Sequence, residues 1–301
     1  MYVNGVPVAD TFAEAFAMWG ARVIVTAAGR EWALAAGRKA TGQATSIIGC
    51  DCEADIEREL DPAETPDGRP GVSLLLFASG KEALAKRLVS RVGQSVMTAP
   101  TTACFDGLGE GEQVRVGGVL RLFGDGYQSA KQLDGIRYNR IPVLDGEFFI
   151  QDRFYVKPAV GGGNLLVLGQ SQPAALKAAE AAVTAMKGVP GVGLPFPGGI
   201  VRSGSKVGAR YKGLVASTND AYCPTLRARR ESLLPPGVNA VYEIVVDGLT
   251  LGAVEEAMRR GILAACDAGA AQVTAANFGG KLGQYQIHLR ALLAGVEGVV
   301  L

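Results

Sequence analysis

Residues 71–92 read GVSLLLFASGKEALAKRLVSRV and carry the clearest structural signal in this 301-residue chain. The first part, Val72–Phe77, is a short apolar run that predicts a buried β-strand. The second part places Leu84, Leu88 and Val92 four residues apart, with basic residues off that stripe, which predicts an amphipathic helix. A strand followed at once by a helix indicates a fold in which helices pack on a β-sheet.

The same order of strand and helix returns at residues 163–187, and a Val-x-Gly tripeptide at residues 3–5 recurs at 246–248, each time before helical spacing. These internal echoes predict two similar lobes. Asp145-Gly146 is turn-like and lies between the echoes. We therefore expect an N-terminal lobe at residues 1–146 and a C-terminal lobe at residues 147–301.

Further helices are predicted at residues 11–19, 174–187 and 253–266, the first from a capping box of Thr11 and Glu14. Short apolar or alternating segments predict further strands at 23–27, 148–150, 165–168, 242–246 and 285–289. These elements interleave without a regular βαβαβ order, and several strands alternate apolar with polar residues. The pattern favours an α+β fold of mainly antiparallel sheets with helices packed on them.

The composition excludes several classes of function. The chain is 48% hydrophobic and 20% charged, which predicts a folded protein with a sizeable core. A net charge of +1 makes nucleic acid a poor partner, and no apolar run approaches the length that spans a bilayer. The first residues do not form a signal-peptide pattern, so we expect a cytoplasmic protein.

Cysteine and histidine usage argues against metal chemistry. The five cysteines form neither a disulfide framework nor a zinc spacing, so we expect free thiols in a reducing compartment. His288 is the only histidine and lies in an alternating segment, where a partly exposed strand residue is the simplest interpretation. Walker-type and dinucleotide-binding glycine motifs are absent from the sequence. We expect no metal or prosthetic group.

Glu243 is a candidate acid–base residue. It lies in the segment VYEIVV at residues 241–246, where strand alternation places it on the same face as Val241 and Val245. Burial there would favour the neutral acid, which can donate a proton or a hydrogen bond near pH 7. The alternative is an edge-strand glutamate that faces water.

Polar and glycine-rich segments provide candidate binding residues. The segment at residues 216–225 offers hydroxyl and amide groups, and the glycines around Lys281 would let backbone N–H groups approach an anion. The alternatives are a capped surface turn and a flexible hairpin, and residues 195–199 and 161–164 are similar glycine-rich loops. The candidate substrate-binding residues are Phe196, Ser217, Thr218, Asn219, Asp220, Asn277, Phe278, Gly279, Gly280, Lys281 and Gln284.

A basic stretch runs from residue 202 to residue 230 and contains few acids. It is interpreted as a solvated face, a site for an anionic substrate tail, or a surface for a partner protein. The residues considered for an anionic tail are Arg202, Lys206, Arg210 and Lys212, and Arg227, Arg229 and Arg230 continue the stretch.

Taken together, the chain resembles the formylmethanofuran:tetrahydromethanopterin formyltransferases nearly end to end. The most specific segments are DTFAEAF (10–16), ETPDGRPG (64–71), FGDGYQ (123–128), FPGGIV (196–201), STNDAYCP (217–224) and NFGGKLGQY (277–285). The resemblance implies two ferredoxin-like lobes, no prosthetic group, and formyl transfer between the amine of methanofuran and N5 of tetrahydromethanopterin. It also implies that Glu243, on a V-Y-E-I-V strand, is the catalytic acid.

The near-neutral composition points, within that family, to the methylotrophic bacteria, where formaldehyde is oxidised to formate. The resemblance there implies the D subunit of a formyltransferase/hydrolase complex, with a zinc amidohydrolase among its partners and homo-oligomer contacts. The basic residues would then hold the carboxylate-bearing tail of methanofuran. Two other hypotheses remain open: a non-catalytic subunit that docks the carrier, and an unrelated acyltransferase with Cys223 as nucleophile.

Overall fold

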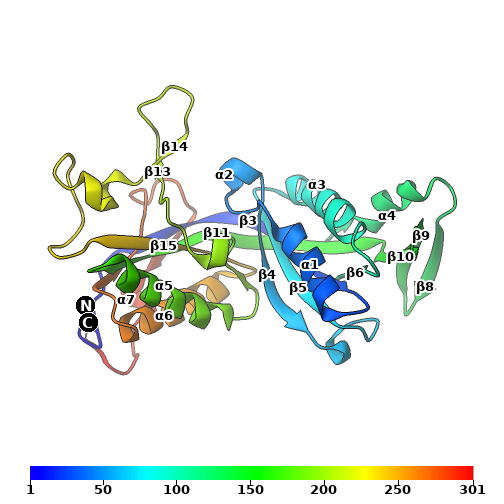
Figure 1. The fold of residues 1–301 in the computed structure, drawn as a ribbon, viewed down its shortest axis with the longest axis horizontal. Helices are drawn as coiled ribbons and strands as arrows, with labels where there is room; N and C mark the ends of the chain where they lie inside the picture. The colour runs from blue at the N-terminus through cyan, green and yellow to red at the C-terminus, as the bar shows by residue number, and fades with distance from the viewer. Residues whose placement is uncertain (301) are drawn as a thin grey trace. The chain divides into compact units, whose positions relative to one another are not determined.

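The computed structural model describes residues 1–300, in which helices are interspersed among runs of strands (Figure 1). Contacts divide the chain into two compact units. Unit 1 comprises Met1–Ala17, Val160–Asp247 and the chain from Leu251 onward, and unit 2 comprises Met18–Ala159 and Gly248–Thr250. Two long strands, β3 (Phe12–Thr26) and β11 (Arg153–Gly169), contribute residues to both units.

Unit 2 is built on the strand and helix of residues 71–92. Val72–Phe77 lies within β5 (Gly71–Ala78), whose eight residues are all buried and which pairs antiparallel with β3 and with β4 (Glu53–Leu60). The helices α1 (Arg30–Thr41) and α3 (Lys81–Arg91) contribute Leu34, Leu84 and Leu88 to one core with the strands. The predicted strand and helix are therefore confirmed.

The sheet of unit 2 extends on the other side of β3. There β3 pairs antiparallel with β6 (Ala103–Asp106), and β6 pairs parallel with β10 (Gly146–Gln151). A hairpin joins β10 to β9 (Ile136–Val143), which pairs with β8 (Ser129–Leu133). The first residues of β11 pair with β7 (Glu112–Arg115).

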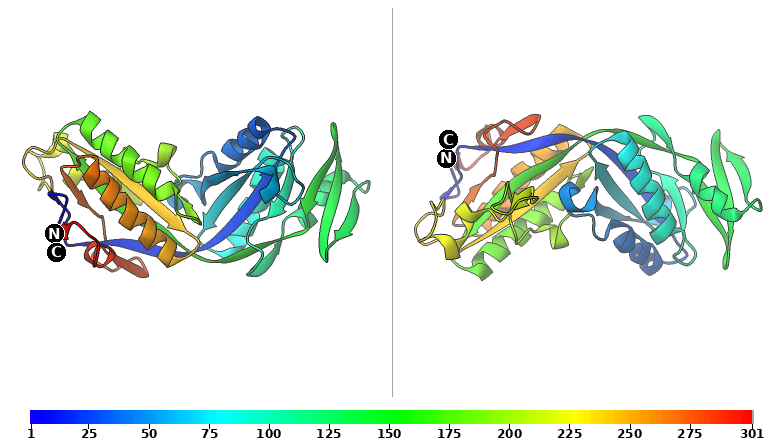
Figure 2. Two further views of the ribbon diagram at one scale, coloured as in Figure 1. Left: turned by 90° about the horizontal axis from the view of Figure 1, so that it is seen from below. Right: turned by 90° about the horizontal axis from the view of Figure 1, so that it is seen from above.

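In unit 1, two long helices cover the strands. Its strands β12 (Val192–Gly193), β15 (Ala240–Gly248) and β11 are neighbours, and β16 (Gln272–Thr274) pairs antiparallel with β11. The helices α5 (Gln172–Lys187) and α6 (Leu251–Asp267) lie side by side across these strands (Figure 2). The core between helices and sheet contains four alanines and Met186 of α5 together with Met258 and Ile262 of α6.

Short elements complete the fold. They are β1 (Tyr2–Val3), β2 (Val6–Pro7), α2 (Ile47–Cys50), α4 (Gly117–Leu120), β13 (Lys206–Val207), β14 (Ala216–Ser217), β17 (Tyr285–His288), α7 (Leu289–Leu292) and β18 (Val299–Val300). β17 pairs antiparallel with the first residues of β3. Over residues 1–300, no helix has the length and apolarity needed to cross a bilayer.

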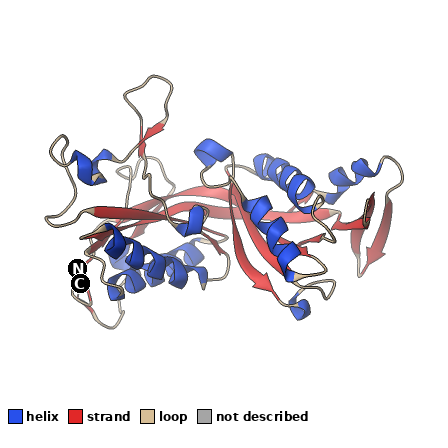
Figure 3. Ribbon diagram, in the orientation of Figure 1, coloured by secondary structure: helices blue, strands red, loops and turns tan. Residues whose placement is uncertain are grey.

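The predicted helix at residues 11–19 is wrong, because residues 12–19 belong to β3, which is drawn as strand in Figure 3. The residues with helical spacing are apolar on both faces of a strand, and Ala13 and Ala15 are fully buried between its neighbours. Glu14 is not part of a capping box but lies opposite Gln286 in the pairing with β17. Only the second Val-x-Gly tripeptide therefore precedes a helix, and this echo does not support two similar lobes.

The other long helices are confirmed, and α1 is an element that the sequence argument missed. The predicted helices at 174–187 and 253–266 correspond to α5 and α6, each of which begins two residues earlier than expected. Of the expected lobe boundary, Asp145 lies in the turn of the β9–β10 hairpin and Gly146 begins β10, both within unit 2. The division into an N-terminal and a C-terminal lobe at residue 146 therefore stays a prediction.

A substitution at Gly169 tests the packing of α5 on the end of β11. A Cβ at this position would lie 2.5 Å from the backbone nitrogen of Ala175 and 2.7 Å from its Cα. Because backbone atoms cannot give way as a flexible side chain can, we expect Gly169→Ala to destabilise the protein by about 1–3 kcal/mol. Equilibrium denaturation with urea measures the loss.

Gly252 in α6 is the matched control, since a Cβ there would meet no atom within 4 Å. Replacing it with alanine removes backbone freedom from the unfolded chain, so Gly252→Ala should be neutral or stabilising by up to about 1 kcal/mol. Equal effects of the two substitutions would contradict the described contact between β11 and α5.

Candidate functional site

Glu243 lies in the middle of β15, and the predicted alternation of that strand is confirmed. Tyr242, Ile244 and Val246 are buried in the core beneath α5 and α6. Glu243 is on the opposite face and is half-buried. Its backbone is held by Val201, whose N–H donates to the Glu243 carbonyl at 2.7 Å and whose carbonyl accepts from the Glu243 N–H at 3.1 Å.

Burial raises the pKa of the Glu243 carboxyl to about 7. Among residues 1–300, no donor hydrogen-bonds to this carboxylate and no cation pairs with it, so nothing offsets the loss of solvation. A carboxyl group in this state is about half protonated at neutral pH. It can therefore give or accept a proton without a large energetic cost in either direction.

The segment 216–225 forms the short strand β14 and a turn of 3₁₀-helix, Asp220–Tyr222. Asp220 accepts a hydrogen bond from Lys206 Nζ at 2.6 Å and pairs with Arg230 at 3.3 Å. The Lys206 hydrogen bond, assisted by the charges of both cations, holds the pKa of the Asp220 carboxyl below its usual range. Asp220 therefore remains ionised and ties the segment to the basic stretch.

Two candidate groups from the sequence lie together in this part of unit 1. A cavity of about 840 Å³ is lined by residues from the basic stretch and from the segment 216–225. Lys206, Arg210, Ser217, Thr218 and Asp220 line it, whereas Arg202, Lys212 and Asn219 do not. Arg229 and Arg230 add further positive charge. Ser217 uses its hydroxyl within the fold, because Oγ donates to the carbonyl of Gly208 at 2.7 Å.

The segment 277–284 forms a loop whose backbone N–H groups point to an internal carboxylate. Glu14 on β3 is fully buried, and its Oε2 accepts from the N–H groups of Phe278 at 2.7 Å and Gly280 at 3.0 Å. Its Oε1 accepts from Leu282 at 2.5 Å and Gly283 at 2.6 Å. The expectation that these N–H groups approach an anionic ligand is corrected, because the anion that they bind is Glu14.

Burial by itself would raise the pKa of Glu14, but the four N–H donors outweigh it and hold the pKa below its usual range. Further bonds fix both ends of the loop. Asn277 Nδ2 donates to Thr11 Oγ1 and to the Phe12 carbonyl, each at 3.1 Å, and Gln284 Oε1 accepts from the Ala17 N–H at 2.8 Å.

Glycine is required at two positions of the loop. At Gly283 a Cβ would lie 2.5 Å from the carbonyl oxygen of Ala15 and 2.7 Å from Glu14 Cγ. Gly280 has a φ of 71°, in the region that glycine adopts without strain. The loop is therefore held by backbone hydrogen bonds and presents the exposed side chain of Lys281 and the half-buried ring of Phe278.

The remaining glycine-rich candidates have structural roles. Residues 161–164 lie inside β11 and are not a loop, which corrects the expectation for them. Asn164 there exchanges two hydrogen bonds with the backbone of Ala276, directly before the loop. Phe196 is half-buried, and its carbonyl accepts from Gly199. His288 is exposed, as expected, and its ring lies 5.2 Å from that of Phe12.

This chain is 57% identical to a formylmethanofuran–tetrahydromethanopterin formyltransferase from Methylococcus capsulatus. The match covers 98% of this chain and the whole of the relative. The chain belongs to this formyltransferase family. The model of this formyltransferase family matches residues 1–143, and the model of the family's proximal lobe matches residues 146–292. The resemblance drawn from the sequence is confirmed.

Two further relatives support the membership and the fold class. A protein of Methylorubrum extorquens, named as the D subunit of a formyltransferase/hydrolase complex, is 53% identical, with 97% of each chain covered. The crystal structure of that organism's formyltransferase/hydrolase complex with methylofuran matches with a TM-score of 0.94 at 52% identity, over 97% of this chain and 98% of the other. The formyltransferase of Methanosarcina barkeri matches with a TM-score of 0.92 at 47% identity, over 97% of this chain and all of the other. The two-lobed α+β fold is confirmed.

Glu14 is the residue that sequence reasoning missed. Its signal is present in FAEAF at residues 12–16, where an acid stands among apolar residues as Glu243 does in its strand. The helical prediction for this segment places Glu14 at a solvated helix end. A strand would place it on a buried face, where an acid needs donors.

The substitution Glu14→Gln tests the role of the buried carboxylate. An amide offers one acceptor oxygen and turns two N–H donors toward the loop, so at least two loop N–H groups lose their partner. We expect the free energy of unfolding at pH 7 to fall by about 2–4 kcal/mol. Because the folded pKa of Glu14 is lowered, the wild-type advantage should shrink as the pH falls below about 4.5.

Glu180→Gln is the control, since Glu180 is an exposed residue of α5. It should change stability by less than about 0.5 kcal/mol. Hydrogen exchange of residues 278–283 completes the test. Protection that survives in Glu14→Gln would mean that the carboxylate does not hold the loop.

Proposed function

We propose that this chain transfers a formyl group between the amine of a methanofuran-type carrier and N5 of tetrahydromethanopterin, with both carriers bound together. The names of its relatives support the reaction. The observation that carries the mechanism is the half-buried Glu243, whose pKa of about 7 leaves a neutral acid available at neutral pH. Methylotrophic one-carbon metabolism, with formaldehyde oxidised to formate, is the proposed setting, supported by the Methylorubrum relative.

The transfer needs no nucleophile from the protein. The amine nitrogen of one carrier attacks the formyl carbon that the other carrier holds, and the carbonyl oxygen becomes an oxyanion. Protonated Glu243 donates a hydrogen bond to that oxyanion or moves the proton from the attacking amine to the leaving amine. The C–N bond to the leaving amine then breaks. Alignment of the two carriers supplies the remaining acceleration.

Cys223 does not need to act in this scheme. Its Sγ lies 3.3 Å from the Asn219 carbonyl and 3.4 Å from Thr218 Oγ1, so the thiol is engaged within the fold. Across the described residues, no group of three or more His, Cys, Asp or Glu side chains could hold a metal ion. The proposed chemistry uses the two carriers and one acid.

The candidate binding residues divide into direct contacts and supports. Phe278 and Lys281 are proposed to contact a carrier, with Phe196 and Asn219 as further contacts. Asn277, Gly279, Gly280 and Gln284 keep the loop in place. The positively charged cavity of unit 1 is proposed to receive the carboxylate-bearing tail of the furan carrier, with Lys206 and Arg210 as cations and Arg202 and Lys212 nearby in sequence.

The proposed assembly follows the Methylorubrum relative. That protein is a subunit of a formyltransferase/hydrolase complex, and the complex was solved with methylofuran. We propose a cytoplasmic protein with homo-oligomer contacts that works with the other subunits of such a complex, including a zinc amidohydrolase. We propose neither a nucleic acid nor a membrane as a partner.

The first experiment mixes the purified chain with a formylated furan carrier and tetrahydromethanopterin. Appearance of formyl-tetrahydromethanopterin without other subunits supports the enzyme. Carrier binding without transfer would contradict the proposal and would favour a subunit that only docks the carrier.

Glu243→Gln tests the acid. The amide cannot give up a proton, so we expect turnover to fall at least about 100-fold. Wild-type turnover should decline as the pH rises through about 7, because ionisation removes the donor. Glu256→Gln is the control, since Glu256 pairs with Arg259 and Arg260 at the surface of α6. Near-normal turnover of Glu243→Gln would remove Glu243 from the mechanism.

A stability measurement separates a catalytic loss from unfolding. The folded pKa of Glu243 is raised, so wild-type stability falls as the pH rises from 4.5, the unperturbed value, to about 7. Glutamine has no charge to bury. We expect Glu243→Gln to be more stable than the wild type at pH 8, by up to about 3 kcal/mol, and to match it near pH 4.

A further inference from the structure

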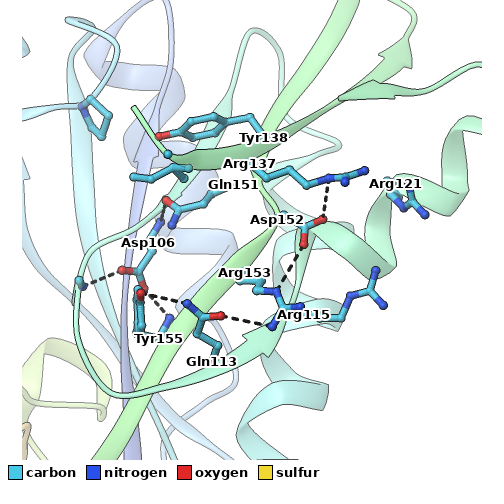
Figure 4. Close-up of a pocket in the computed structure, with 14 residues that line it drawn as sticks. Asp106, Gln113, Arg115, Arg121, Arg137, Tyr138, Gln151, Asp152, Arg153 and Tyr155 are labelled. Carbon is cyan, nitrogen blue, oxygen red and sulfur yellow. Dashed lines mark hydrogen bonds and ion pairs between the residues drawn. The ribbon is translucent and has the colours of Figure 1, made fainter. Parts of the chain in front are cut away.

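Unit 2 contains a concave site lined by four arginines, which none of the proposed chemistry uses (Figure 4). The cavity has a volume of about 760 Å³. Arg115 ends β7, Arg121 follows α4, Arg137 is in β9, and Arg153 begins β11. Four separate elements therefore place arginine side chains around one cavity.

The acids of the cavity balance only part of this charge. Asp152 is 7% exposed, and Asn139 Nδ2 donates to its Oδ1 at 2.9 Å. The Nε atoms of Arg137 and Arg153 are each 3.9 Å from its carboxylate oxygens, beyond hydrogen-bonding distance. Asp106, the other acid, accepts from the backbone N–H groups of Gly109 and Tyr155. Four guanidinium groups thus face two carboxylates.

Two of the arginines have no partner within the fold. Arg115 and Arg121 make neither a hydrogen bond nor an ion pair with any residue from 1 to 300, and Arg121 Nε is buried and unsatisfied. Arg22 and Arg140 of unit 2 behave differently, since Arg22 binds Glu57 through two bonds and Arg140 pairs with Glu147. A buried donor without an acceptor costs stability unless a ligand supplies one.

We propose that this cavity binds a small multivalent oxyanion, carried by a phosphate or by clustered carboxylates. Guanidinium groups present paired N–H donors that match the oxygens of both anions. Arg115 and Arg121 provide the unused donors, and Arg137 and Arg153 add charge from the side of Asp152. Tyr138 and Tyr155 line the same cavity and offer hydroxyl and ring surface to the body of a larger ligand.

Isothermal titration calorimetry with the full chain tests the proposal, with sodium pyrophosphate and sodium citrate as separate probes. We expect saturable binding of at least one probe that weakens as NaCl is raised, because the attraction is between charges. Tighter binding of pyrophosphate assigns a phosphate ligand, and tighter binding of citrate assigns a polycarboxylate.

Variants locate the binding. Arg121→Gln and Arg115→Gln should each weaken the preferred probe about tenfold or more, because each removes charge-assisted hydrogen bonds. Arg38→Gln is the control, since Arg38 is an exposed arginine at the end of α1 outside the cavity, and it should leave the affinity unchanged. Arg153→Gln replaces Arg121→Gln if circular dichroism shows that the latter does not fold.

Two results would overturn the proposal. The first is the absence of binding by both probes at millimolar concentration. The second is equal affinity of the cavity variants and Arg38→Gln. The formyl-transfer assay is not a readout here, so this test stands or falls independently of the proposed function.

Discussion

The carboxylate of Glu14 organises the loop that follows β16 and joins this loop to β3. Four backbone N–H groups between Phe278 and Gly283 converge on two oxygens that are shielded from water. No regular element could satisfy these donors, because the loop changes direction at two glycines with positive φ. The carboxylate therefore accepts the backbone hydrogen bonds that a neighbouring strand would accept from a β-strand. In this way it fixes where Phe278 and Lys281 lie.

Glu14 and Glu243 show how surroundings give the same side chain opposite properties. Both lie in strands among apolar residues, and burial acting alone would raise the pKa of each. At Glu14 the four donors outweigh burial and keep the charge. At Glu243 no donor among the described residues opposes it, and the pKa rises to about 7. The first residue is suited to support and the second to proton transfer.

The sequence was informative where the signal was local. Val72–Phe77 and the leucines that follow are confirmed as β5 and α3, and the alternation around Glu243 is confirmed in β15. It misled at residues 11–19, because Phe12, Phe16 and Trp19 satisfy helical spacing but lie in a strand whose first residues pair with β17, more than 250 positions away. The arginine cavity could not be foreseen, since Arg115, Arg121, Arg137 and Arg153 come from four elements whose neighbours are decided only by tertiary pairing.

The partition of β3 between the two units has a consequence for synthesis on the ribosome. Residues 18–159 form one continuous stretch that holds nearly all of unit 2, so this part can mature while translation continues. Glu14 emerges earlier still, yet its partners lie 264 to 269 residues downstream. Until that late segment is made, a carboxylate destined for the interior stays hydrated on an unfinished strand. Such long-range closure is slow in general, so the last stage of maturation belongs to the beginning and the end of the chain together.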